Sequence, residues 1–362
     1  MSTRKQKIAH RSRRNPTTAE TWTSGGFIVS VSFELADPPG VSQWFVHCPG
    51  QDKIRFAGDP LILSCAEAFV LLVICFTGSS SRKASTDYFV YRAGPGTPTL
   101  DLLPIPYPRN FDHNAVGIYA VVVPIPRFIS SAQSKTMEYK LRVFWSESQT
   151  WTGKKARLAS DSETNFLKVL HHEGTEVISL GAEPRDELLS LELDHLSARP
   201  FRDVNVVDGF IKFVELRFHN RTVVNQRVLN EGWTATVWNR MISSGGWQEG
   251  YTVATDDVSI IDSVNLSQMP VLLPEIFDVG AKRLTWDRVM CNSPTLSLTR
   301  DDVVYMLAKV KLEDPVAFML AVNVRNKTLE ALQQCCGKTM VCLEPTYKAS
   351  VFSSYLGTTV GI

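Results

Sequence analysis

The strongest constraint on the fold is a series of three apolar segments between residues 294 and 332, separated by short polar turns. Residues 303–310 and 316–324 are rich in Val, Ala, Leu and Met, and a Glu-Asp-Pro turn lies between them. Apolar runs bounded by Asp, Asn and Pro predict an antiparallel meander. A meander is a scaffold and holds no catalytic set of residues by itself. This region therefore predicts a fold and not an activity.

Similar segments recur along the chain, in clusters that begin near residues 61, 115, 201 and 294. The predicted strands lie at 27–35, 61–76, 87–92, 100–103, 116–123, 139–145, 155–158, 203–218, 234–240 and 250–254. Asp208-Gly209 predicts a hairpin turn inside the 203–218 segment. A repeating unit of three or four strands predicts an all-β, propeller-like array of antiparallel three- to four-stranded sheets. A β-sandwich is the alternative fold.

The predicted organisation has three parts: a disordered basic tail at 1–24, a single β-propeller-like domain at 25–337, and a C-terminal extension or closing strand at 338–362. The tail lacks apolar periodicity, which is typical of a disordered segment. Its basic residues are Arg4, Lys5, Lys7, Arg11, Arg13 and Arg14. Such a cluster suggests a nuclear-import signal or an arm that binds anionic surfaces, although many basic termini have no role.

Charge and hydropathy exclude two classes of partner. The chain has 38 Lys and Arg against 37 Asp and Glu, so a specific nucleic-acid partner is not expected. The longest apolar run, 61–76, is shorter than the roughly 20 residues of a membrane-spanning helix and contains Glu67. We interpret this run as two buried strands and expect no membrane partner.

The cysteines indicate a compartment. There are seven, with no Cys-x-x-Cys pair, and several lie in apolar runs, where a thiol behaves as a small hydrophobic group. The basic, polar start of the chain is unlike a secretory signal. We therefore expect free thiols in the cytoplasm, the nucleus or both.

Five segments together resemble one known family. They are Phe33-Glu-Leu-Ala-Asp-Pro-Pro-Gly-Val-Ser, Val46-His-Cys-Pro-Gly50, Thr86-Asp-Tyr-Phe-Val-Tyr-Arg-Ala93, Arg202-Asp-Val-Asn-Val-Val-Asp-Gly-Phe-Ile-Lys-Phe-Val-Glu215, and Pro294-Thr-Leu-Ser-Leu with Asp301-Asp-Val-Val-Tyr305. In order and spacing they resemble the plant proteins of "domain of unknown function 1618", a family expanded in grasses. The last segment is also similar to the β-propeller associated with plant F-box proteins. The resemblance implies a propeller-like fold, by analogy, and no established chemistry.

The chain departs from the family pattern in two places. Family members carry a Trp-rich segment where this chain has residues 183–199, which contain no Trp. The resemblance therefore implies one truncated blade and an exposed sheet edge there. No F-box helical bundle is expected before Phe27.

Candidate chemical sites are few. His171 and His172, near Glu173 and Glu176, lack the spacing of a metal motif, and we interpret them as part of a polar loop. Cys335, Cys336 and Cys342 also lack zinc-site spacing. No metal or cofactor is expected.

Two acidic pairs, Asp256-Asp257 and Asp301-Asp302, could supply the carboxylates of a propeller-type glycosidase. Each pair directly precedes a predicted strand, where Asp commonly stabilises a turn. The turn interpretation is favoured.

The tryptophans suggest a different function. The candidates for partner contact are Trp145, Trp151, Trp233, Trp238 and Trp247. Trp dominates binding hot spots, but packing inside the protein is its commoner role. We predict a non-catalytic protein-interaction scaffold or adaptor that binds a protein partner. The alternatives are a carbohydrate-active hydrolase that uses the Asp pairs, or a degenerate paralogue with little function.

Overall fold

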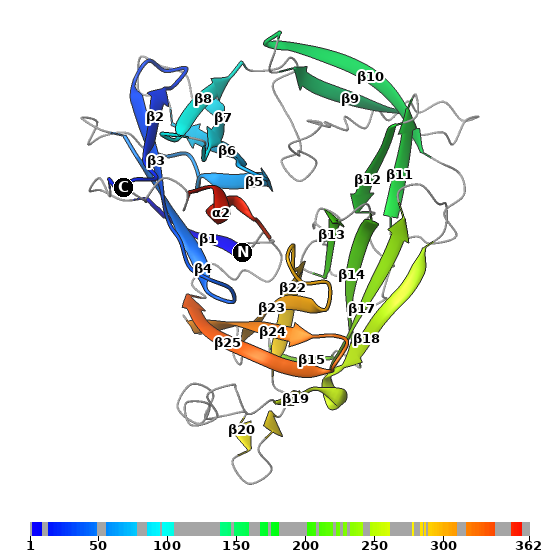
Figure 1. The fold of residues 1–362 in the computed structure, drawn as a ribbon. Coiled ribbons are helices and arrows are strands. Elements are labelled where there is room, and N and C mark those ends of the chain that lie inside the picture. Colours follow the sequence, from blue (N-terminus) through cyan, green and yellow to red (C-terminus); the bar gives the residue numbers. More distant parts are fainter. Residues whose placement is uncertain are drawn as a thin grey trace. The chain divides into compact units, whose positions relative to one another are not determined.

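The structure is a computed structural model of the chain (Figure 1). It describes residues 2–8, 14–48, 56–77, 85–94, 96–104, 138–145, 148–158, 167–172, 175–180, 201–207, 210–219, 222–224, 227–229, 232–241, 247–260, 277–278, 283–284, 286, 289–309, 316–336 and 349–356. The chain divides into two compact units, which are described separately. Unit 1 contains Met1–Ser2, Ala36–Val41 and Ala182–Ala349. Unit 2 contains Thr3–Leu35, Ser42–Gly181 and Ser350–Ile362.

Unit 2 contains three four-stranded sheets. Two of their strands begin with a residue that is assigned to unit 1, namely Ser2 and Val41. The first sheet has the order β1-β4-β3-β2, the second β5-β6-β7-β8, and the third β12-β11-β10-β9. The strands are β1 (Ser2–Ile8), β2 (Ala19–Trp22), β3 (Ile28–Glu34), β4 (Val41–His47), β5 (Leu61–Ala66), β6 (Phe69–Phe76), β7 (Ser85–Arg92), β8 (Thr99–Leu103), β9 (Glu138–Trp145), β10 (Thr150–Leu158), β11 (Leu167–His172) and β12 (Thr175–Leu180).

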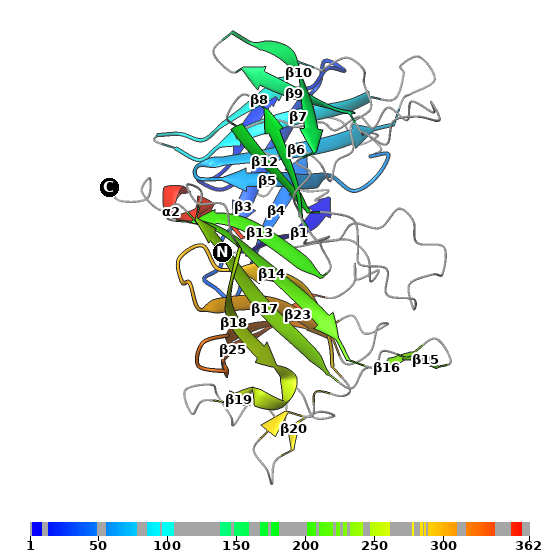
Figure 2. The ribbon, with the colours of Figure 1, turned by 90° about the vertical axis from the view of Figure 1, so that its right-hand side faces the viewer.

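Unit 1 is built on two larger sheets, with the strand orders β13-β14-β17-β18 and β19-β25-β24-β23-β22 (Figure 2). Only the short β19 runs parallel to its neighbour, β25. The strands are β13 (Arg202–Val207), β14 (Phe210–Phe218), β15 (Thr222–Val224), β16 (Arg227–Leu229), β17 (Trp233–Met241), β18 (Gln248–Ala254), β19 (Ser259–Ile260), β20 (Phe277–Asp278), β21 (Arg283–Leu284), β22 (Met290–Leu296), β23 (Val303–Lys309), β24 (Val316–Asn323) and β25 (Thr328–Cys336). A 3-10 turn, η3 (Thr255–Asp257), precedes β19.

The predicted all-β class is confirmed, and among the strand pairs whose register is described, all are antiparallel except β19–β25. The predicted meander corresponds to β23, β24 and β25. The apolar run 61–76 forms β5 and β6, and Glu67 lies in the turn between them with a φ of 47°. Among the described residues, no helix is long and apolar enough to cross a membrane. The propeller arrangement and the single domain at 25–337 stay predictions, and segments 116–123 and 183–199 lie outside the described residues.

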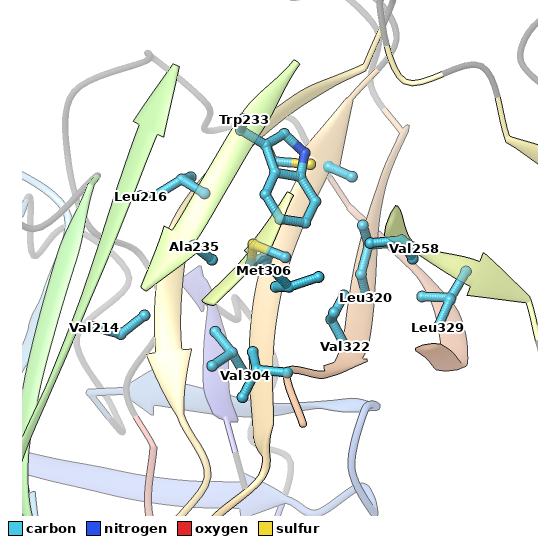
Figure 3. Close-up of a cluster of buried hydrophobic side chains, with 14 of the residues drawn as sticks. Val214, Leu216, Trp233, Ala235, Val258, Val304, Met306, Leu320, Val322 and Leu329 are labelled. Carbon is cyan, nitrogen blue, oxygen red and sulfur yellow. The ribbon is translucent and has the colours of Figure 1, made fainter. Parts of the chain in front are cut away.

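The core of unit 1 lies between its two larger sheets (Figure 3). Trp233 and Ala235 on β17 face Met306 and Leu320 on β23 and β24. Because side chains alternate along a strand, one face of each sheet can be apolar throughout. Both faces of β23 are buried, since a second cluster that includes Leu307 lies on its other side. Strands buried on both faces have continuous apolar sequences, which is why the sequence of residues 303–310 predicts a strand clearly.

The core of unit 2 combines strands with residues from far along the chain. Its largest cluster includes Phe33 of β3, Ile74 of β6 and Tyr91 of β7. The short helix α2 (Phe352–Leu356) adds Phe352 and Leu356 to the same cluster. Within segment 338–362, residues 352–356 therefore form a packed helix, and the C-terminal extension or closing strand stays a prediction for the segment as a whole.

The structure differs from the predicted disordered tail over residues 14–24. β2 lies inside this segment and pairs with β3. The Tyr91 hydroxyl donates a hydrogen bond to the Thr17 carbonyl oxygen at 2.5 Å, and the buried Asp87 carboxylate accepts hydrogen bonds from Ser24 N and Oγ. These contacts come from distant strands, so local sequence does not reveal them. Three of the six basic residues lie in β1, and Arg14 forms an exposed ion pair with Glu20.

Candidate functional site

Two predicted tryptophans lie on the β9–β10 hairpin of unit 2. The register pairs Trp145 with Thr150, and Trp151 with Phe144, so the two indoles point to opposite faces. Trp151 packs against Phe144, with ring centroids 5.2 Å apart, and its Nε1 donates to the Pro104 carbonyl oxygen at 2.9 Å. Phe144 in turn packs on the apolar cluster of the β5–β8 sheet. Trp151 therefore has a structural role that fixes the hairpin.

Trp145 has the opposite environment. It lies on the face away from Phe144, and 49% of its surface is exposed. Its Nε1 donates a hydrogen bond to Thr152 Oγ1 at 2.9 Å. A side chain already held in one position loses less conformational entropy when a partner binds to it. The ring of Trp145 is thus an exposed, pre-positioned aromatic surface.

The three predicted tryptophans of unit 1 are in or near packed regions. Trp233 is fully buried and packs edge-to-face on Trp286, with centroids 5.8 Å apart. Trp238 and Trp247 are half-buried beside Phe213. Phe213 on β14 is the cross-strand partner of Trp238 on β17, and its ring centroid lies 6.3 Å from that of Trp247. Trp233 is therefore a core residue and not a contact for a partner. Two of the five candidates lie in unit 2 and three lie in unit 1.

Sequence reasoning did not identify four other exposed large apolar side chains among the described residues, one of which is Leu35 at 38% exposure. Trp22, at the end of β2, is 62% exposed. Phe210 and Met241 are paired across β14 and β17 and are both exposed. A short strand such as β2 gives little periodic signal, and Phe210 and Met241 come together only through the pairing of β14 with β17.

The acidic pairs form turns and ion pairs. Asp257, in η3, accepts a hydrogen bond from Lys327 Nζ at 2.7 Å. Asp301 pairs with the buried ammonium group of Lys212, and the carbonyl oxygen of Asp302 accepts a hydrogen bond from the amide of Val324. Both pairs lie in turns, as the favoured interpretation predicted, but these contacts join them to residues far along the chain.

A polar network surrounds Asp302 at one end of the β22–β25 sheet. Arg300 donates through Nη1 and Nη2 to the two carboxylate oxygens of Glu330, at 2.5 and 3.0 Å. Asn323 Nδ2 donates to both Asp302 and Glu330 at 2.8 Å, and Asn323 Oδ1 accepts from the amides of residues 325 and 326. The network thus holds the β24–β25 turn.

The electrostatics of this network keep both carboxylates ionised. Burial alone would raise the pKa of Asp302, but the hydrogen bond from Asn323 and the charge of Arg300 outweigh it, so the pKa is lowered. The hydrogen bond from Arg300 lowers the pKa of Glu330. The Lys327 hydrogen bond and charge likewise lower the pKa of Asp257. A general acid needs a raised pKa, so none of these three carboxyl groups is suited to that role.

We expect the free energy of unfolding of the double variant Asp302→Asn/Glu330→Gln to depend less on pH in the acid range than that of the wild type. A carboxyl group with a lowered folded-state pKa stabilises the protein above its unfolded pKa of about 4 and loses this contribution as the pH falls through the folded value. Below about pH 4.5, the wild type should therefore lose unfolding free energy more steeply than the variant. Urea denaturation at a series of pH values measures this. Arg300→Gln should also flatten the curve, and equal slopes in all three proteins would contradict the assignment.

A second ionic cluster is buried in the β13–β14 hairpin. Arg202 donates through Nε and Nη2 to Glu215 Oε1, at 3.2 and 2.9 Å. Both side chains are only 4% exposed. The Nε of Arg217, an exposed residue, donates to Glu215 Oε2 at 2.7 Å. Each carboxylate oxygen of Glu215 thus accepts from an arginine, which is the condition for burying a charge.

The remaining candidates show no reactive arrangement in the described parts of the chain. His171 and His172 lie in β11 and not in the predicted loop. No group of three or more potential metal ligands occurs among the described residues. Cys48, Cys75 and Cys291 form no disulfide, as expected, and burial raises the pKa of the Cys48 and Cys291 thiols to about 12. Cys342 lies outside the described residues.

The region around the buried ion pair carries the similarity to known proteins. Residues 177–305 match DUF1618. The description of this family is "Protein of unknown function (DUF1618)". The DUF1618 region extends from β12 into β23 and includes Arg202, Glu215 and Trp233. It supports the family resemblance over a shorter span than residues 25–337. No curated protein matches the chain.

Proposed function

We propose that this chain is a non-catalytic protein-interaction module of the cytoplasm or nucleus, and that the β9–β10 hairpin of unit 2 presents a contact for its protein partner. The exposed ring of Trp145, fixed by Thr152, is the observation that carries the proposal. Trp is the residue type most enriched in binding hot spots, and a fixed ring binds at a lower entropic cost.

The occupied indole N–H limits how a partner can bind. Because Nε1 already donates to Thr152, the ring offers mainly its apolar faces. Exposed hydroxyl groups lie close by, since Ser148 and Thr150 are hydrogen-bonded to each other at 2.7 Å. An apolar centre with polar groups at its edge is the usual composition of a protein interface.

We expect Trp145→Ala to weaken partner binding at least about 30-fold, which corresponds to the 2 kcal/mol of a hot spot. The measurement is quantitative capture from an extract of the source tissue, followed by titration with the purified partner. Trp22→Ala is the matched control, because Trp22 is also an exposed Trp of unit 2. Trp145→Phe should retain part of the affinity.

Two results would contradict the proposal. One is a partner that binds the Trp145→Ala and wild-type proteins equally. The other is the absence of any reproducible partner for the folded protein. Imaging of the tagged chain tests the compartment, and protein found only outside the cell would contradict it.

The glycosidase alternative receives less support. The pKa of Asp257 is lowered by its contact with Lys327, and that of Asp302 by its contacts with Asn323 and Arg300. Asp301 forms an ion pair with Lys212. A hydrolase of this type needs one carboxyl group that is protonated at neutral pH. A screen against glycosides, with Asp302→Asn as the inactive reference, distinguishes this class from the binding module.

A further inference from the structure

Residues 15–24, which we call the strap, lie along one edge of the first sheet of unit 2. The strap contains β2, the last strand in the order β1-β4-β3-β2, and its four residues pair with β3. Ala19 of the strap belongs to the largest apolar cluster of the unit, whereas the ring of Trp22 is mostly exposed. The burial of one Ala side chain stabilises little, so polar contacts hold most of the strap in place.

The N-terminal end of the strap is held by hydrogen bonds to two buried residues. Thr17 Oγ1 accepts a hydrogen bond from the Phe33 amide at 2.7 Å, and Asn15 Nδ2 donates to the Phe33 carbonyl oxygen at 2.9 Å. The Tyr91 hydroxyl donates to the Thr17 carbonyl oxygen at 2.5 Å. Phe33 and Tyr91 are both buried, so the strap satisfies polar groups at the border of the core.

The C-terminal end of the strap is held by one buried carboxylate. Asp87 on β7 is completely buried, and it accepts hydrogen bonds from the Ser24 amide at 2.8 Å and from the Ser24 hydroxyl at 2.5 Å. Burial of a carboxylate is tolerated when hydrogen-bond donors satisfy it, and Ser24 supplies two. Because β7 belongs to the second sheet of the unit, this contact joins the strap to a sheet with which β2 does not pair.

A flexible turn connects the strap to β3. The turn contains Gly25 and Gly26, and Gly26 has a φ of 74°, which glycine adopts without steric cost. A Cβ atom on Gly26 would meet no atom within 4 Å, so the backbone has space to move there. A few residues that absorb large changes in φ and ψ are enough for a hinge. Rotation about this turn would separate the strap from β3.

We propose that the strap opens and closes as one unit about the Gly25-Gly26 turn, and that the contact between Ser24 and Asp87 is its latch. In the closed state the strap covers one edge of β3, whose other neighbour in the sheet is β4. The open state exposes that edge and brings water to the Tyr91 hydroxyl and the Asp87 carboxylate. Segments with few buried apolar contacts open at a lower free energy than the whole unit. The strap is independent of the Trp145 surface.

The test is amide hydrogen exchange of the full-length chain, measured at a series of low urea concentrations by mass spectrometry that resolves single amides. In the wild type, the protected amides of β2 should exchange at least about 100-fold faster than those of the central strand β6. Their rates should also depend little on urea, since opening of the strap exposes little surface. Equal rates and equal urea dependence in β2 and β6 would show that the strap leaves only on global unfolding, and would overturn the proposal.

Three variants test the latch and the unity of the strap. Ser24→Ala removes a hydrogen bond to a carboxylate and should raise exchange in β2 about 10-fold or more. Glu20→Gln is the matched control, because it lies on the strap in an exposed ion pair and should change exchange by less than about 5-fold. Tyr91→Phe removes a bond at the opposite end from the latch and should still raise exchange of the Thr23 amide about 5-fold. An unchanged rate at Thr23 would show that the two ends open separately, which contradicts one unit.

Proteolysis provides a second readout of the open state. Chymotrypsin cleaves after Trp22 only when β2 is unpaired, so the cleavage rate follows the population of the open strap. Ser24→Asp leaves the core residues in place and puts a second carboxylate against Asp87, so it should speed cleavage at Trp22 more than Ser24→Ala does. Equal cleavage rates for the wild type and Ser24→Asp would overturn the assignment of the latch.

Discussion

Glu215→Ala is expected to lower the free energy of unfolding of unit 1 by about 3–5 kcal/mol. The substitution removes the carboxylate that Arg202 contacts through two nitrogen atoms, while the guanidinium group remains buried. Removal of one member of a buried ion pair costs more than the intact pair contributes. Urea denaturation followed by tryptophan fluorescence measures the change.

Arg217→Ala provides the matched control for this prediction. Arg217 contacts the same carboxylate but is 59% exposed, and exposed ion pairs contribute about 0–1 kcal/mol. A large loss for Glu215→Ala with a small loss for Arg217→Ala is the expected pattern. Similar losses for both would mean that the burial of Arg202 does not determine the energetics of the cluster.

Trp233→Ala should destabilise unit 1 by about 3–5 kcal/mol, the usual range for a buried Trp or Phe. The ring is fully buried between the two sheets and packs on Trp286 (Figure 3). Truncation to Ala leaves a cavity that these sheets cannot close easily. Thermal and urea denaturation measure the loss, and Trp238→Ala, at a half-buried site, should cost clearly less.

Trp233→Phe separates packing from hydrogen bonding. Among the described residues, the buried Trp233 Nε1 has no hydrogen-bond partner of ordinary geometry, so removal of this N–H group should cost little hydrogen-bond energy. The Phe variant should therefore be clearly more stable than the Ala variant. If Trp233→Ala instead abolished partner binding and left stability unchanged, the core assignment would be wrong.

The strands that the sequence predicts best are those whose residues determine their own environment. β23 and β24 are almost entirely apolar because both faces are buried, and polar residues in the sequence on either side mark their ends. The two-residue Asp208-Gly209 spacing also agrees with the register, in which Val207 pairs with Phe210. These features are local, so a single sequence reveals them.

Other features depend on pairing between distant residues. β22 contains Pro294 and a bulge, with Ser293 at a φ of 51°, so its sequence does not resemble a regular strand. The contact between Arg202 and Glu215 arises because β13 and β14 place them directly opposite each other.

The tryptophans show the same limit more sharply. The sequence alone does not distinguish the roles of Trp145 and Trp151. The register places Trp151 with Phe144 toward the core and Trp145 toward solvent. A one-residue shift in pairing would exchange their roles. Their separation into a packing residue and a candidate contact therefore needed the structure.

The position of α2 also has a consequence for how the protein is made. Translation reads residues 182–349, nearly all of unit 1, between the main part of unit 2 and the segment that completes its core. A nascent chain that ends at residue 349 contains all of unit 1 but lacks Phe352 and Leu356. Domains generally fold as units in the order of their synthesis. Here the main part of unit 2 is synthesised before nearly all of unit 1, and it obtains the last residues of its core only after unit 1 has been fully translated.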